Sequence, residues 1–164
     1  MEENLSRDRL QPFLLDRLTD DQRDQPNETR DQRVMILRQL HQAVLRDLEW
    51  LLNTPRHTPD EEIYDFPMAA KSVLNFGMPS LSGLSADSMD MPTIERMIID
   101  TIQTYEPRVI PHSLNVRAVS SNSSHNLMSF EIRAEIWAVP MPDRLFVRTE
   151  LDLESGHCHL QEKN

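Results

Sequence analysis

The chain has 164 residues with 27 acidic and 17 basic side chains, and its net charge of −10 argues against partners such as nucleic acids or anionic membrane surfaces. Its single cysteine, Cys158, allows no internal disulfide and suits a reducing compartment. The acidic start lacks the features of a secretory signal, and no apolar run reaches the roughly 20 residues of a membrane helix, so we expect a cytoplasmic protein without membrane insertion.

The first 30 residues are predicted to be a flexible segment that carries one short apolar helix. The apolar patch of this segment spans residues 10–18. Residues 19–33, which follow it, are rich in Asp, Arg and Gln, the composition of a linker. We expect residues 31–156 to form a single domain and residues 157–164 to form a polar tail.

Three helices are predicted in the first two thirds of the domain. Residues 31–52 carry apolar side chains at alternating three- and four-residue steps, the pattern of a helix with one buried face, and Pro55 ends it. A short helix over residues 69–75 is expected to close at Gly77. The third helix runs from residue 92 or 93 to residue 105.

After Pro107 the apolar period changes from 3.6 to 2, which indicates strands. Residues 114–118, 130–138 and 145–153 alternate apolar and mainly polar side chains, and short connectors between them predict antiparallel neighbours. The predicted fold class is α+β, with N-terminal helices packed on a small C-terminal antiparallel sheet of about three to four strands. One edge of that sheet is expected to be open to pairing with another chain.

One charged motif stands where the third helix ends and the sheet begins. Glu106 and Arg108 flank Pro107, which cannot continue a helix and stiffens the turn. In one interpretation the motif is a rigid two-charge prong that docks on a partner. In the other it is a helix-ending turn with a local or intradomain ion pair.

The sequence predicts no catalytic residues, cofactor or metal. A glycosidase needs two carboxylates facing each other across a sugar site, and no pattern brings two of the candidates Glu95, Asp100, Glu106 and Glu135 together. The cluster His157-Cys158-His159 is a single group of ligand-type residues in a polar tail, and we expect it to be exposed and adventitious. The three glycines form no phosphate-binding loop.

Five blocks of the sequence, spanning about residues 10–156, resemble the TssE family. This family is the type VI secretion relative of the lysozyme-like wedge protein of contractile phage tail baseplates. The blocks are Leu14-Leu15-Asp16-Arg17-Leu18, residues 44–54 (VLRDLEWLLNT), residues 72–83 (SVLNFGMPSLSG), Tyr105-Glu106-Pro107-Arg108-Val109 and residues 127–156. The second, third and fourth are specific in combination.

The resemblance implies a structural role in a baseplate wedge on the cytoplasmic side of the inner membrane. The implied partners are TssF and TssG, with TssK, the VgrG spike hub and the TssB/TssC sheath around them. The motif Glu106-Pro107-Arg108 would hold the wedge together, and the sheet would help to start sheath assembly. The family's description as lysozyme-like also raises the alternative of a peptidoglycan-cleaving enzyme, although the sequence shows no catalytic pair.

Overall fold

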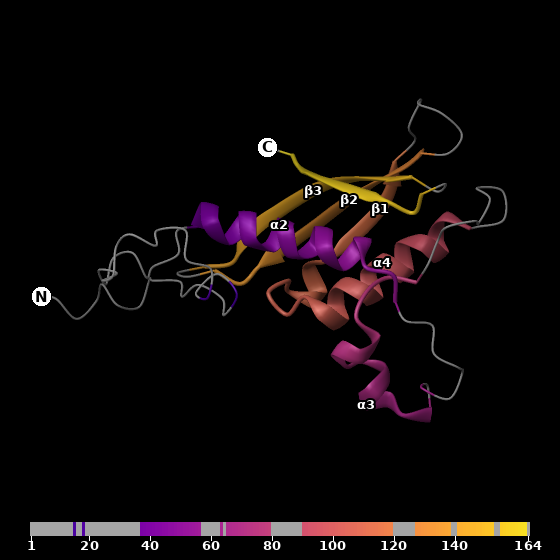
Figure 1. Cartoon of the computed structure of the whole chain (residues 1–164). Helices are drawn as coiled ribbons and strands as arrows, with labels where there is room; N and C mark the ends of the chain where they lie inside the picture. Colours follow the sequence, from indigo (N-terminus) through magenta and orange to yellow (C-terminus); the bar gives the residue numbers. More distant parts are fainter. Residues whose placement is uncertain are drawn as a thin grey trace, which may run out of the picture.

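A computed structural model describes Leu15, Leu18 and residues 37–56, 63, 65–79, 90–119, 127–138, 141–152 and 155–163. Within these residues the helices precede a four-stranded antiparallel sheet, so the predicted α+β class is confirmed (Figure 1). No helix of the described part of the chain is long and apolar enough to cross a membrane.

The sheet is a meander in which each strand pairs with the next along the chain. The strands are β1 (Asn115–Val119), β2 (Leu127–Ile136), β3 (Asp143–Asp152) and β4 (Cys158–Glu162), in the order β1-β2-β3-β4. The central pair is in register from Leu127 opposite Asp152 to Ile136 opposite Asp143. The three predicted strands are therefore confirmed.

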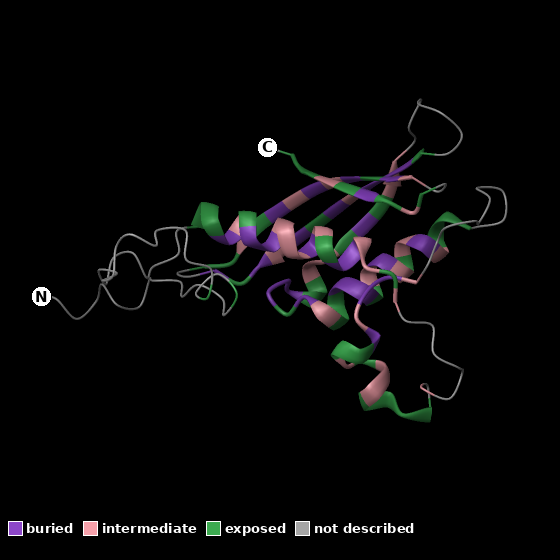
Figure 2. Ribbon diagram, viewed as in Figure 1, coloured by how far each residue is buried: buried purple, intermediate pink, exposed green. Residues whose placement is uncertain are grey.

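Two long helices cover one face of the sheet. Helix α2 (Leu37–Asn53) and helix α4 (Met91–Tyr105) turn their buried sides toward it, as Figure 2 shows. The described part of the first helix agrees with the predicted period, whereas residues 31–36 lie outside the described residues. The third predicted helix begins within one or two residues of the expected start and ends at the expected Tyr105.

The core lies between these helices and the inner face of the sheet. The alternation of the strands places apolar side chains inward and charged ones outward. The fully buried large side chains of this core are Val44, Leu48, Leu51, Ile94, Ile102, Phe130, Ile132, Ile136, Leu145 and Val147.

A small lobe, residues 65–79, lies between the two long helices in the chain and differs from its prediction. A single helix was expected over residues 69–75, but the structure has α3 (Pro67–Ala70) and then a separate 3-10 turn, η2 (Val73–Asn75). The Ser72 hydroxyl donates to the Ala69 carbonyl and accepts from the Leu74 N–H. A serine that bonds the backbone in this way competes with helical hydrogen bonding and breaks the helix.

Gly77 then returns the lobe to the end of α2. Its φ is +117°, and a Cβ at this position would lie 2.3 Å from the Thr54 carbonyl oxygen. Two hydrogen bonds flank this contact, from the Met78 N–H to Thr54 O (2.9 Å) and from the Arg56 N–H to Met78 O (2.7 Å). The glycine therefore allows two backbone segments to approach closely.

The prediction of a polar tail over residues 157–164 is wrong, because strand β4 lies in this segment. Cys158 and Leu160 face the core, while His157, His159 and Gln161 face outward. Only two apolar residues mark this alternation, too few to outweigh the polar composition. Of the predicted N-terminal helix, only Leu15 and Leu18 are described, both as helical, and the rest of that segment lies outside the described residues.

Candidate functional site

The Glu106-Pro107-Arg108 motif forms a turn whose two charges bind each other. The Arg108 Nε donates to Glu106 Oε1 (2.5 Å), and the Arg108 Nη2 donates to Glu106 Oε2. The Arg108 backbone N–H also donates to Glu106 Oε1 (3.1 Å). Glu106 is 4% and Arg108 9% exposed, whereas Pro107 is exposed at the tip of the turn. Glu106 and Arg108 therefore form a buried, bidentate ion pair, whose charge-assisted hydrogen bonds are stronger than those between neutral groups.

A third partner comes from helix α2. The Asp47 Oδ2 accepts from Arg108 Nη2 (2.7 Å), and the Asp47 Oδ1 accepts from Arg46 Nε (2.9 Å). Burial lowers the pKa of Arg108, but Glu106 and then Asp47 outweigh it, so the pKa lies above its ordinary value. The guanidinium therefore stays charged and joins the end of α4 to the middle of α2.

The same turn is attached to the sheet through its backbone. The Trp137 N–H donates to the Arg108 carbonyl (2.9 Å), and the Ile110 N–H donates to the Glu135 carbonyl (2.8 Å). Val109 lies between these bonds and is buried. The motif thus connects α2, α4 and the end of β2, and the sheet fixes its position.

The structure bears differently on the two interpretations of the motif, the intradomain ion pair and the docking prong. The intradomain ion pair is present, and the two charged groups do not project from the surface as a prong would. Binding of a partner by Glu106, Pro107 and Arg108 stays a prediction. A contact made at this turn would have to use Pro107 and the side chains around it.

Those surrounding side chains form an open, mainly apolar groove. It has a volume of about 580 Å³, and the motif forms one wall. The other lining residues come from the N-terminal segment, α2, the lobe and α4: Leu15, Asp47, Trp50, Leu51, Thr54, Phe76 and Tyr105.

Aromatic side chains dominate the groove. Trp50 is 53% exposed, and the Arg46 guanidinium lies 5.2 Å from the centre of its ring. Phe76 and Tyr105 meet edge to face with ring centres 5.4 Å apart. Exposed tryptophan and half-buried aromatic rings beside an arginine are the side chains that most often carry binding energy at protein interfaces.

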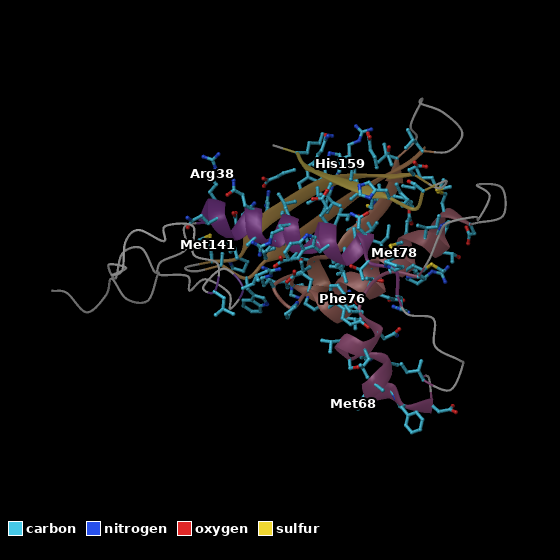
Figure 3. The ribbon with its side chains drawn as sticks, viewed as in Figure 1. Arg38, Met68, Phe76, Met78, Met141 and His159 are labelled. Atoms are coloured by element: carbon cyan, nitrogen blue, oxygen red, sulfur yellow. The ribbon has the colours of Figure 1, made fainter. Side chains whose placement is uncertain are left out.

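The lobe extends this apolar surface outward. Its exposed large side chains are Phe66, Met68, Val73 and Leu74. Phe76 lies where the lobe joins the body and Met68 lies farther out on it (Figure 3). The lobe is tied to α4, because the Tyr105 hydroxyl donates to the Asn75 carbonyl (2.7 Å).

Comparison with known proteins agrees with this architecture. The family described as baseplate wedge protein gp25 matches residues 38–141, from the first turn of α2 to the end of β2 and the residues just after it. The chain belongs to this family. No curated protein and no solved structure gives a significant match.

Membership of the gp25 family assigns a structural role in a baseplate, in assembly with other baseplate components. The match includes the motif, Asp47 and all the groove residues except Leu15. The surface described above therefore lies in the part of the chain that the family shares.

The acidic residues considered for catalysis in the sequence are dispersed. Glu106 is paired with Arg108, and Glu95 accepts a hydrogen bond from the Ala118 N–H (2.7 Å). In the groove itself, Asp47 and Glu106 both bind the same guanidinium. The carboxylates of Asp47 and Glu106 therefore stabilise the fold here and do not face a substrate from two sides.

The expectation that the whole His157-Cys158-His159 cluster is exposed is wrong for Cys158. The cysteine is buried in β4 against the core, while its two histidine neighbours are exposed. Burial raises the pKa of the Cys158 thiol to about 12, which makes it an unreactive core residue. Among the described residues no group of three His, Cys, Asp or Glu side chains is arranged to hold a metal.

Sequence reasoning missed Asp47, Trp50 and Phe76 as parts of one site. Asp47 lies three residues after Val44 and four before Leu51, both buried, so it borders the apolar stripe of α2. A carboxylate there signals a buried or half-buried partner. Trp50 and Phe76 gave no comparable signal, because a groove forms only when distant segments meet.

We expect the ion pair to dominate local stability. Glu106→Ala and Arg108→Ala should each lower the free energy of unfolding by about 3–5 kcal/mol, because each leaves one buried charge without its partner. The double variant should lose clearly less than the sum of the two. Urea unfolding of the isolated protein measures all three.

The matched control is Arg133→Ala, which removes an exposed ion pair to Glu131 (3.0 Å) on the outer face of the sheet. It should cost much less than either motif variant. Losses in Glu106→Ala and Arg108→Ala no larger than that of the control would contradict a structural role for the pair.

Proposed function

We propose that this chain is a TssE-like wedge subunit of a type VI secretion baseplate that binds TssF- and TssG-like proteins through the groove beside Pro107. The observation that carries the proposal is the groove itself, an open apolar surface whose wall is the buried Glu106–Arg108 turn. The sequence blocks that resemble TssE supply the identity of the partners.

The chemistry of the groove favours an apolar protein segment as its occupant. Its charged side chains are engaged within the chain, so Trp50, Phe76 and Tyr105 supply the contact area. An amphipathic helix laid in such a groove buries its apolar face against the rings. Beyond Phe76 the lobe carries further exposed apolar side chains, Met68 among them, which would enlarge the surface.

In this proposal the two charges of the motif do not bind the partner directly but keep the groove in shape. Glu106 and Arg108 hold the end of α4 against α2 and β2, and Pro107 presents a rigid edge to the partner. Loss of either charge would then weaken wedge assembly through distortion of the groove. The subunit would lie on the cytoplasmic side of the inner membrane, near TssK and the VgrG hub.

The two tryptophans of the chain provide a test that does not depend on the buried ion pair. Trp50 is 53% exposed in the groove and Trp137 is 61% exposed outside its lining. Trp50→Ala should weaken binding to co-expressed TssF and TssG by at least about 30-fold, the effect of losing an aromatic hot spot of about 2 kcal/mol. Co-purification on a sizing column, followed by titration calorimetry, measures this loss.

The control is Trp137→Ala, which should bind like the wild type, and both variants should keep the wild-type melting temperature within a few degrees. Equal binding by wild type and Trp50→Ala would rule out the groove. If the wild-type chain eluted apart from TssF and TssG, the wedge proposal itself would fail.

We further propose that β4 is the edge at which the sheet helps to start sheath assembly. The Asn53 side chain occupies only the first residue of this edge, donating to Cys158 O (2.7 Å) and accepting from Cys158 N (2.8 Å). The next residues whose backbone N–H and C=O point away from β3 are Leu160 and Glu162, and these groups have no partner among the described residues. Two such alternate residues suit addition of a strand.

Strand β1, at the opposite edge of the sheet, is less suited to the addition of a strand. Glu95 of α4 accepts from the Ala118 N–H, which points away from β2. Within the described strand this leaves Val116 as the one residue of β1 whose backbone N–H and C=O both point away from β2 without a partner. A side chain that bonds an edge N–H blunts that edge in the same way as other protective devices of natural sheets.

Proline at position 160 tests the choice of edge. Because the Leu160 N–H points away from β3, Leu160→Pro removes one outward donor without removing a hydrogen bond of the β3–β4 ladder. It should weaken capture of a TssB/TssC sheath subunit about fivefold, as expected for one hydrogen bond of about 1 kcal/mol. Leu160→Ala loses the same packing but keeps the donor and should retain most of the binding. Equal capture by the two variants would exclude this edge.

A further inference from the structure

Helix α2 fastens strand β4 at three points along its length. Asn53 binds both backbone groups of Cys158, as described above. Glu49 lies 3.4 Å from the His159 ring, and His41 lies 2.7 Å from Glu162. The positions along α2 fall as those along β4 rise, so helix and strand run antiparallel. Only the Asn53 contact uses the backbone of β4, and the other two are made between side chains.

His41 differs from the other two residues because both of its ring nitrogens lie at hydrogen-bond distance from a carboxylate. Its Nδ1 lies 2.7 Å from Glu162 Oε1 at the end of β4, and its Nε2 lies 2.8 Å from Asp143 Oδ2 at the start of β3. The side chain of His41 is 14% exposed, while those of the two carboxylates are more than a third exposed. The imidazole of His41 therefore links helix α2 to both β3 and β4.

Hydrogen-bond chemistry requires a proton on each nitrogen. A carboxylate can only accept, and a neutral imidazole has one N–H and one lone pair. With two carboxylates at hydrogen-bond distance, only the imidazolium satisfies both contacts. In the neutral ring one nitrogen lone pair would face a carboxylate oxygen.

We propose that His41 is a proton-operated clasp that holds the C-terminal end of β4 and the start of β3 on helix α2. Protonated, it bridges Glu162 and Asp143. When it loses its proton, one of the two contacts breaks and the end of β4 loosens, while Asn53 keeps the beginning of the strand attached to α2.

Among the described residues, the other charged groups near His41 are engaged elsewhere or point away, so Glu162 and Asp143 are its partners. On α2, Arg38 is exposed one turn before His41, and Glu49 pairs with His159. On β3, Arg144 alternates to the outer face of the sheet. Beyond β4, Lys163 pairs with Glu131 on that outer face (3.3 Å).

The direction of the titration follows from these contacts. Burial lowers the pKa of His41, but the hydrogen bonds and charges of Glu162 and Asp143 outweigh it, so the pKa lies above the ordinary value of 6.5. A raised folded-state pKa stabilises the folded protein fully below the unfolded value, and this contribution is lost as the pH rises through the folded value. The clasp is therefore closed in mildly acidic solution and opens on the alkaline side.

A consequence for assembly rests on the proposed function. Where β4 is the edge that receives a partner strand, the proton on His41 sets how firmly that edge is held. The clasp itself is a property of the isolated chain, and it can be tested without any partner.

The experiment is an NMR titration of the full chain combined with amide hydrogen exchange. His41 should titrate above the ordinary imidazole value of 6.5. His112, which is exposed, serves as the control position. Between pH 6 and pH 9 the protection factors at Gln161 and Lys163, whose N–H groups face β3, should fall relative to that at His159. The ratio should change about tenfold for each pH unit by which the His41 pKa exceeds its unfolded value.

The variant His41→Gln should remove this pH dependence, and Glu162→Gln should reduce it, while His112→Gln should leave it intact. A His41 that titrates at or below 6.5 would overturn the proposal, even if the His41 variant failed to fold. A constant protection ratio across the range in the wild-type protein would overturn it as well. Binding of sheath subunits does not enter either measurement.

Discussion

The buried ion pair between Glu106 and Arg108 is the interaction on which the arrangement of this molecule depends. Glu106 caps the end of helix α4, and the backbone carbonyl of Arg108 accepts from Trp137, just after β2. Through Asp47 the same guanidinium reaches helix α2. Buried charges are stable only when they are paired and hydrogen-bonded, so the three elements are held in one geometry.

This geometry keeps the charges of the motif away from the surface. Glu106 and Arg108 bind each other inside the chain, whereas their neighbours Trp50 and Pro107 are exposed. The groove exists because α2, the lobe and α4 converge at the motif. In the wedge role proposed for this member of the gp25 family, the ion pair prepares the surface and the aromatic rings supply the contact area.

Much of the fold follows from local periodicity. The apolar repeats of α2, α4 and the first three strands each mark a buried face, and short connectors between the strands predict the antiparallel meander. The rest depends on contacts between distant segments. Asp47 and Arg108 are 61 positions apart, and His41 and Glu162 are 121 apart, so no local pattern pairs them. Strand β4 was missed because its order depends on pairing with β3 and on side chains from α2.

Site-specific photo-crosslinking in an assembled baseplate would show which side of the motif meets a partner. A photoreactive phenylalanine derivative would replace Trp50 in one variant and Trp137 in another. If the groove binds the partner, we expect crosslinks from position 50 to TssF or TssG and few from position 137. Crosslinks from position 137 alone would contradict it, since the partner would then contact the motif from outside the groove.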